Sequence, residues 1–206
     1  MPRTQEGLAR LIDRERLRNP RIAEAFRSVD RADFVPVQHR LGAYRDRPIG
    51  IPNQQTTSQP SLIARMIDVA EIGPDDRVLE VGTGYGFQTA LLGRVAGNVV
   101  SIELHPRLAR VAEENLQAAG INNVSVVVGD GWAGHQETAP YDAVIVSAAA
   151  SELPAALVEQ LAEGGRLVIP LRERGGDNVY LFRKKSSGIT RDLLVTPARF
   201  VPLVRS

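Results

Sequence analysis

Three glycines at alternate positions, Gly82, Gly84 and Gly86, directly follow an apolar run that is typical of a buried strand. Because glycine has no Cβ, the backbone here can turn sharply and approach a ligand closely. A helix expected to begin near Phe87 would direct its free N–H groups to the same place. Glu103 ends the next apolar run, where its carboxylate could accept hydrogen bonds from both hydroxyls of a ribose. These residue types in this order indicate a site for a nucleoside cofactor.

The spacing of the glycines distinguishes between two kinds of cofactor. A dinucleotide-binding fingerprint has glycine at its first, third and sixth positions, and here the sixth position is Phe87. The sequence instead has E-x-G-x-G-x-G from Glu80 to Gly86, in which a third close approach of the backbone replaces the glycine that packs helix against strand. This spacing favours S-adenosylmethionine over NAD. The alternative for Glu103 alone is an ordinary surface glutamate.

Two further segments carry candidate binding residues. Asp130 lies between two glycines after a later apolar run, where it could accept a hydrogen bond from an adenine amino group while Gly131 leaves space for the ring. A simple turn is the alternative, because Asp and Gly are common turn formers. Residues 55–60 are dense in hydroxyls and amides, and Ser58 could be the N-cap of a following helix, an active-site serine, or both.

Other catalytic chemistries lack the residues that they need. The chain has no cysteine, which excludes disulfides, thiolate catalysis and cysteine-ligated zinc. No G-x-S-x-G segment lies between a strand and a helix, so no acyl-transfer triad is indicated. The histidines, His39, His105 and His135, are expected on the surface or in loops rather than in catalysis. The carboxylates lack metal-ligand spacing, so no metal is predicted.

Composition suits one domain of an ordinary cytoplasmic enzyme. The chain has 206 residues, enough for a substantial core, and its formal net charge of +1 gives no general attraction to nucleic acid or to an anionic membrane. No apolar stretch approaches the roughly 20 residues that span a bilayer. The amino-terminal stretch is charged throughout, without the apolar core of a signal peptide. The arginines between Arg10 and Arg21 are expected to form solvated helix faces.

The expected elements bring the candidate residues to one edge of a sheet. Residues 6–31 are predicted to be helical, with inward positions at Leu8, Leu11, Ile12, Ile22, Ala25 and Phe26, residues 34–59 to form an ordered loop or short strands, and residues 60–70 to form a helix. Strands are then expected at 77–81, 99–103, 124–128, 143–147 and 166–170, alternating with helices at 87–95, 106–119 and 154–162. Residues 178–183 and 199–204 are expected to form an antiparallel edge. The pattern predicts an α/β fold with a doubly wound, mostly parallel sheet, whose strand ends bring together Gly82, Glu103, Asp130 and Ser147.

Several motifs, in order along nearly the whole chain, carry a resemblance to a known family. They are V-D-R-A-D-F-V-P at 29–36, A-Y at 43–44, P-I-G at 48–50, T-T-S-Q-P at 56–60, residues 78–86, G-D-G at 129–131, P-Y-D-A at 140–143, G-G-R-L-V-I-P at 164–170 and F-V-P-L at 200–203. The ordered set resembles the protein-L-isoaspartate (D-aspartate) O-methyltransferase family. The resemblance implies a single Rossmann-like domain of the class I S-adenosylmethionine-dependent methyltransferases over residues 1–206. Residues 1–58 would form a helical segment with an active-site loop, and residues 59–206 the cofactor-binding core.

The resemblance also implies an activity and residues that carry it. The enzyme would methylate the free carboxylate of L-isoaspartyl residues in damaged proteins, which initiates repair through a succinimide. D-aspartyl residues are a second candidate substrate. It would act as a monomer, without nucleic acid or membrane. Ser58 would be the active-site serine, in an orienting rather than a nucleophilic role. The implied cofactor-binding residues are Gln55, Thr56, Thr57, Ser58, Gly82, Thr83, Gly84, Gly86, Glu103, Leu104, Asp130 and Gly131, and the implied substrate-binding residues are Thr57, Ser58, Ala148, Ala149 and an edge strand with Val201, Pro202 and Leu203.

The sequence departs from the family pattern at three positions. Gln54 replaces a usual glycine before the Gln-Thr pair, Thr57 replaces a usual isoleucine before the serine, and Asp177 follows the late glycine turn where a glutamine is expected. These departures leave open a specialised relative that methylates a normal aspartate of one peptide. A non-catalytic cofactor-binding domain is the third alternative, because a fold alone does not fix a function.

Overall fold

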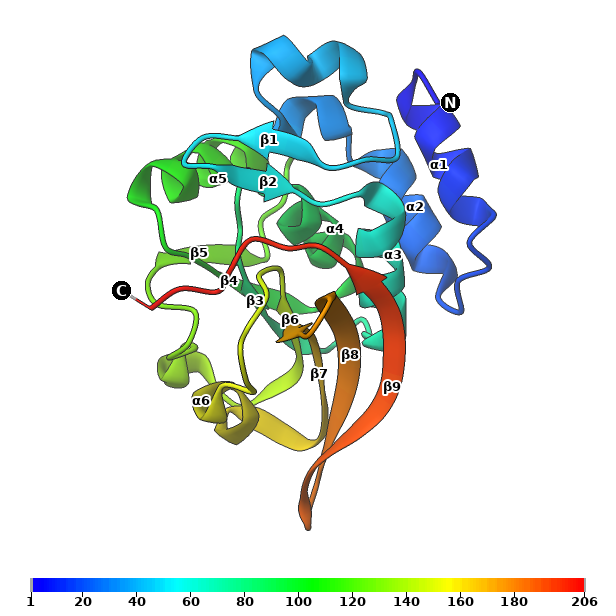
Figure 1. Ribbon diagram of the computed structural model, residues 1–206. Coiled ribbons are helices and arrows are strands. Elements are labelled where there is room, and N and C mark those ends of the chain that lie inside the picture. Colours follow the sequence, from blue (N-terminus) through cyan, green and yellow to red (C-terminus); the bar gives the residue numbers. More distant parts are fainter. Residues whose placement is uncertain (1, 206) are drawn as a thin grey trace.

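The computed structural model describes residues 2–205 and is built around one seven-stranded sheet (Figure 1). Its strands are β3 (Arg77–Val81), β4 (Asn98–Glu103), β5 (Val124–Val128), β6 (Tyr141–Val146), β7 (Leu161–Glu173), β8 (Gly176–Lys185) and β9 (Gly188–Ala198). Their order across the sheet is β5-β4-β3-β6-β7-β8-β9. Strands β3 to β7 pair in parallel, whereas β8 and β9 are antiparallel. The predicted α/β fold, with a mostly parallel sheet and an antiparallel edge, is confirmed.

The central strands are buried on both faces. Successive side chains of a strand point to opposite faces of the sheet, so Val78 of β3 belongs to one hydrophobic core and Leu79 to the other. The first core receives side chains from α1 (Gln5–Asp13), α2 (Pro20–Ser28), α3 (Pro60–Val69), α4 (Phe87–Val95) and α5 (Pro106–Ala118). On the second face, Leu157 of the short helix α6 (Ala155–Glu159) packs with Tyr141. The larger helical layer therefore lies on one side of the sheet.

The amino-terminal segment is two helices rather than one continuous helical stretch over residues 6–31. Asn19 caps α2 by accepting a hydrogen bond from Arg21 N, and Pro20 occupies the first turn, where its missing N–H is tolerated. Arg16, at φ 54°, lies in the left-handed region between the helices. The expected inward residues are buried, except Leu11, which is half-buried.

Residues 31–57 form short 3-10 turns and a hairpin, as the irregular sequence predicts. The turns are η1 (Arg31–Phe34) and η2 (Val37–Gly42). The hairpin pairs β1 (Ile49–Ile51) with β2 (Gln55–Thr57) in antiparallel register. Gln54, in the connecting turn, has φ 57°. A left-handed conformation is one that glycine adopts without cost, which is consistent with the glycine that the family usually has there.

The carboxyl-terminal elements differ from the expected ones in two places. The helix predicted over 154–162 ends at Glu159, and β7 begins at Leu161. The predicted edge strand over 199–204 is also wrong, because β9, which ends at Ala198, pairs with β8. Most of β9 is exposed, so it lacks the apolar signal of a buried strand. Residues 199–204 instead cross the carboxyl ends of the parallel strands, as the red segment of Figure 1 shows.

Candidate active site

The loop after β3 has the strained geometry that its glycines permit. Gly82, Gly84 and Gly86 have φ values of 98°, 57° and 89°, which fall in the region that side chains with a Cβ rarely adopt. Gly86 is also the N-cap residue of α4. A Cβ on Gly82 would lie 3.3 Å from Ser147 Cβ, so the backbone passes close to the end of β6. The three glycines are therefore needed at these positions, because residues with a Cβ would be strained at such φ values.

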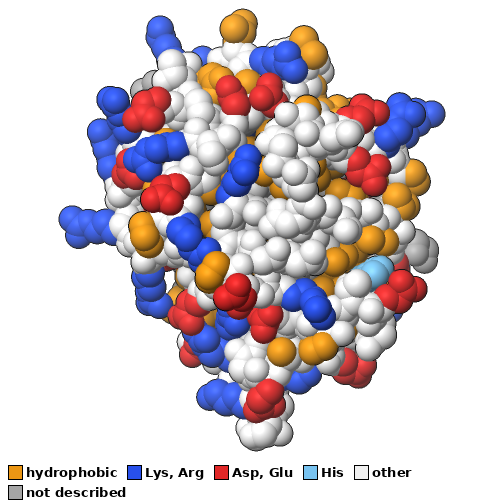
Figure 2. All heavy atoms as spheres, turned by 180° about the vertical axis from the view of Figure 1, so that it is seen from behind, with side chains coloured by type: hydrophobic (Ala, Val, Ile, Leu, Met, Phe, Trp, Pro, Cys, Tyr) orange, Lys and Arg blue, Asp and Glu red, His pale blue; other side chains and the backbone are white. Residues whose placement is uncertain are grey.

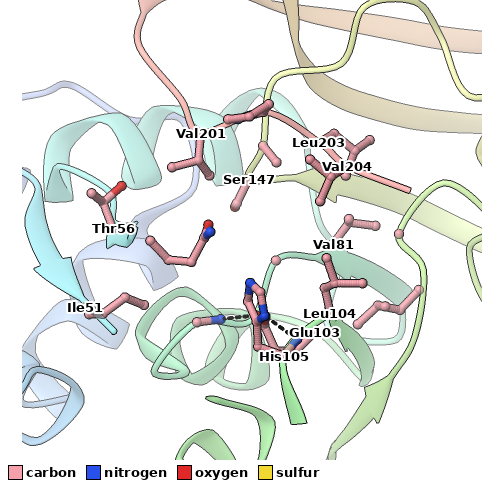
Figure 3. Close-up of a pocket in the computed structure, with 17 residues that line it drawn as sticks. Ile51, Thr56, Val81, Glu103, Leu104, His105, Ser147, Val201, Leu203 and Val204 are labelled. Carbon is pink, nitrogen blue, oxygen red and sulfur yellow. Dashed lines mark hydrogen bonds between the residues drawn. The ribbon is translucent and has the colours of Figure 1, made fainter. Parts of the chain in front are cut away.

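A cavity opens above this loop at the carboxyl edge of the sheet. Its walls come from six segments, and they comprise Ile51, Gln55, Thr56, Val81, Gly82, Gly84, Ile102, Glu103, Leu104, His105, Gly131, Ser147, Ala148, Val201, Pro202, Leu203 and Val204. Figure 3 shows side chains of the β1–β2 hairpin, of the end of β4 and of the carboxyl-terminal segment around the same space. Parallel sheets bind ligands at this edge.

Glu103 is held rigidly at the cavity wall. Its side chain is 5 % exposed, Oε2 accepts a hydrogen bond from Gly84 N at 2.8 Å, and Oε1 accepts one from His105 N at 3.0 Å. Each carboxylate oxygen has further acceptor capacity, so a pair of hydroxyls in the cavity could still donate to it. Figure 3 draws both backbone contacts. Glu103, the last residue of β4, is therefore fixed beside the glycine loop.

Gly131 leaves room that a larger residue would fill. A Cβ there would overlap Val81 Cγ1 and lie 3.3 Å from Leu203 Cδ1. Asp130 does not line the cavity; its Oδ1 accepts a hydrogen bond from Trp132 N at 2.8 Å, which stabilises the turn. The structure thus places Gly131 at the cavity wall, whereas Asp130 is not among the lining residues.

Ser58 lies in an adjoining groove rather than in the cavity. The groove is lined by Pro48, Thr56, Ser58, Gln59, Ser61, Leu62, Arg65 and residues 196–199, and Thr56 lines both spaces. The N-cap residue of α3 is Gln59, so the interpretation of Ser58 as the N-cap is wrong. Of the other expected site residues, Thr57, Thr83, Gly86 and Ala149 do not line the cavity either. The backbone of Ala149 is hydrogen-bonded to the carboxyl-terminal segment. Its N–H donates to Val201 O and its carbonyl oxygen accepts from Leu203 N, each at 2.8 Å.

A buried arginine, which the sequence does not reveal, fixes the loop that carries Ser58. Arg31 is 0 % exposed, and its Nη2 donates to Ser58 O at 2.9 Å and to Arg47 O at 3.1 Å. Its Nη1 donates to Ala43 O at 2.8 Å and to Arg45 O at 3.0 Å. Burial lowers the pKa of Arg31 to about 10, against the raising effect of the Asp46 charge. One guanidinium thus holds four carbonyl groups beside the groove.

A second buried polar group lies beneath the glycine loop. Glu80 is 0 % exposed and accepts hydrogen bonds from Gln88, Thr89 and Ser101. Burial raises the pKa of Glu80 from 4.5 to about 7, although its three hydrogen bonds oppose this shift. Gln88 also contacts Ser147, which lines the cavity. The motif E-x-G-x-G-x-G signals Glu80, but nothing in the sequence links it to Ser147.

The histidines and the departures from the family pattern have structural explanations. His39 is exposed, whereas half-buried His105 lines the cavity at the residue that precedes α5. Asp177 Oδ2 accepts a hydrogen bond from Phe200 N at 2.9 Å, so it anchors the start of the carboxyl-terminal segment. Gln54 occupies a turn away from the cavity lining.

The face of the molecule that Figure 2 shows has no single dominant charge, because Lys and Arg side chains are interspersed there with Asp and Glu. Within residues 2–205, no helix has the length and apolar character to cross a bilayer. The same residues contain no group of three or more His, Cys, Asp or Glu side chains that could hold a metal ion.

A parallel sheet with a glycine loop after its first strand and a buried acid after its second defines a class I S-adenosylmethionine-dependent methyltransferase fold. The sequence model of the family "Protein-L-isoaspartate(D-aspartate) O-methyltransferase (PCMT)" matches residues 3–206. The chain belongs to this family.

Individual relatives agree with this assignment. The chain is 44% identical to a protein-L-isoaspartate O-methyltransferase of Koribacter versatilis over 95% of this chain and 90% of that protein. It is 42% identical to one of Methanoregula boonei over 91% of this chain and 86% of that protein. A crystal structure from Plasmodium falciparum, described as a protein-L-isoaspartate O-methyltransferase in complex with S-adenosyl-L-homocysteine, superposes with a TM-score of 0.86 at 25% identity and covers 100% of both chains.

Proposed function

We propose that this chain transfers a methyl group from S-adenosylmethionine to the free carboxylate of L-isoaspartyl residues in proteins and peptides. The observation that carries the proposal is Glu103, whose carboxylate is locked by Gly84 N and His105 N beside the glycine loop in a chain of this family. The methyl ester formed would close to a succinimide, whose hydrolysis returns some normal aspartate.

The cavity residues fit the cofactor. Glu103 would accept hydrogen bonds from the ribose hydroxyls, with Leu104 packed beside the nucleoside. Gly131 leaves the space for an adenine ring, which is supported by the overlap that a Cβ would create with Val81. Gln55 and Thr56 would cover the cofactor from the β1–β2 hairpin. When bound, the cofactor supplies an electrophilic sulfonium methyl group.

The acceptor group requires little acid or base catalysis. A carboxylate with a pKa of about 4 is already ionised at neutral pH, so no proton has to be removed from it. The protein must instead orient and desolvate one of its oxygens. Ser58, in the groove that meets the cavity at Thr56, would donate an orienting hydrogen bond to the substrate. Thr57, Ala148, Ala149 and residues 201–203 would dock the peptide around it.

The contacts of the departing residues favour repair over a specialised substrate. Gln54 lies in the turn between β1 and β2, and Asp177 holds Phe200 N, so both lie away from the cavity lining. The specialised relative that methylates normal aspartate stays the alternative that the assay must separate. We further propose a monomeric cytoplasmic enzyme that acts without nucleic acid or membrane, which sedimentation and fractionation would test.

The decisive experiment measures methyl transfer from labelled S-adenosylmethionine to a peptide with one isoaspartate and to its normal aspartate twin. We expect transfer to the isoaspartyl peptide alone. Transfer only to the twin would support the specialised relative, and cofactor binding without transfer to either would support a non-catalytic domain. Ser58→Ala should lower the rate constant markedly while the Kd for the cofactor is largely retained; an unchanged rate constant would exclude the orienting role.

A further inference from the structure

The buried Glu80 side chain fixes the direction of a chain of hydrogen bonds that ends in the cavity. Its Oε1 accepts from Gln88 Nε2 at 2.9 Å, and its Oε2 accepts from Thr89 Oγ1 and Ser101 Oγ, each at 2.5 Å. An amide nitrogen can only donate hydrogen bonds, so the Gln88 amide nitrogen, rather than its oxygen, faces both Glu80 and Ser147.

Gln88 in turn fixes the hydroxyl group of Ser147. Gln88 is 7 % exposed, and its Nε2 has two hydrogens; one goes to Glu80 and the other to Ser147 Oγ at 2.9 Å. Because Ser147 accepts this bond, its own hydrogen is free to point elsewhere. Within residues 2–205 the Ser147 hydroxyl donates to no protein acceptor, and the side chain lines the cavity (Figure 3).

The position of Ser147 relates it to the substrate rather than to the nucleoside. Ser147 directly follows β6 and lies beside Gly82, and Figure 3 shows it near Val201. Thr56, on the wall of the same cavity, is where the groove with Ser58 meets it. Ala149, two residues after Ser147, donates its N–H to Val201 O at 2.8 Å, so Ser147 adjoins the segment that would dock the peptide.

We propose that Ser147 donates a hydrogen bond to the acceptor carboxylate, and that Gln88, held by Glu80, is the positioning residue that aims it. This inference rests on the proposed carboxyl methylation. One carboxylate oxygen accepts from Ser147, and the other attacks. The attacking oxygen forms a bond to the methyl carbon as the carbon–sulfur bond breaks, its electron pair stays on sulfur, and no proton is transferred.

Ser147→Ala tests the hydroxyl directly. We expect kcat/KM for the isoaspartyl peptide to fall about ten- to a hundredfold, because a hydrogen bond to a charged group is lost. The Kd for S-adenosylmethionine, measured by calorimetry, should stay within about twofold. Ser147→Thr, which restores a hydroxyl, should recover most of the activity. Ser151→Ala removes an exposed serine nearby and serves as the matched control, with unchanged kinetics.

Gln88→Met tests the positioning role. We expect a loss of kcat/KM similar to that of Ser147→Ala, and the double variant should lose little more than either single one, because the two residues act as a unit. If Gln88→Met is less stable than the wild type, its loss of activity could reflect unfolding. Ser147→Ala then carries the test, provided that its melting curve equals that of the wild type.

The outcomes distinguish this inference from the proposed function. Wild-type kinetics for Ser147→Ala on an active enzyme would overturn the inference alone. A rise in the cofactor Kd as large as the loss in kcat/KM would also overturn it, because the hydroxyl would then serve the cofactor. A wild-type protein that methylates neither peptide would refute the proposed function and the inference with it.

Discussion

Replacement of Arg31 by methionine should destabilise the protein strongly and loosen the segment that carries Ser58. The guanidinium donates four hydrogen bonds, to Ala43 O, Arg45 O, Arg47 O and Ser58 O. Bonds to a charged group contribute about 1.5–2 kcal/mol each at the lower end of their range, or about 6–8 kcal/mol together. Methionine keeps much of the side-chain volume but donates none of these bonds.

Part of this loss is returned, because a buried charge is also removed. The lowering of the Arg31 pKa to about 10 reflects a desolvation cost, net of the Asp46 charge, of about 3 kcal/mol. The net loss in the free energy of unfolding is then about 3–5 kcal/mol, the range found when one partner of a buried charged interaction is removed. Arg31→Lys should lose less, about 2–3 kcal/mol, because an ammonium has three donors for four carbonyls.

Urea denaturation at fixed temperature measures this difference. Arg94→Met is the matched control, because the exposed Arg94 donates one hydrogen bond, to Ala119 O at 3.1 Å; it should cost less than about 1 kcal/mol. For folded Arg31→Lys, we expect kcat/KM to fall more than cofactor affinity, since the anchor of Ser58 O is weakened. A loss below about 1 kcal/mol for Arg31→Met would refute the reasoning.

Three further predictions concern the cavity and the group beneath it. Glu103→Gln should raise the Kd for S-adenosylmethionine about ten- to a hundredfold in calorimetry, because an amide nitrogen cannot accept from a backbone N–H or a ribose hydroxyl; unchanged affinity would contradict the assignment. Gly131→Ala should lower the free energy of unfolding by about 1–3 kcal/mol and weaken cofactor binding, whereas Gly129→Ala, whose Cβ would approach Ile102 Cγ2 at 3.8 Å, should change both less. The Glu80 pKa, raised from 4.5 to about 7, means that the folded state binds a proton more tightly than the unfolded state, so the free energy of unfolding should fall by about 3 kcal/mol, relative to Glu80→Gln, as the pH rises from 4.5 to above 7. Parallel stability curves for these two proteins in urea across that pH range would show that Glu80 does not titrate in this way.

The sequence determined the elements whose signals are local. The strands at 77–81 and 124–128 have the predicted bounds, because each is a short apolar run that ends at a glycine. The sequence predicts the glycine loop and the position of Glu103 for the same reason. Turn geometry and an acid at a strand end both depend on residues that are neighbours in the chain. Family membership follows from motifs that are also short and ordered along the chain.

Only the tertiary structure decided which polar side chains meet. Arg31 looks in the sequence like any surface arginine, yet it is buried because folding brings Ser58 O, 27 residues away, to its guanidinium. Gln88 and Ser147 are 59 residues apart in the chain and touch because β3 and β6 are neighbours in the sheet. Residues 201–204 are apolar and line the cavity, although the same pattern is typical of an edge strand. Contacts of this kind depend on strand order and loop paths, and local residue patterns do not encode them.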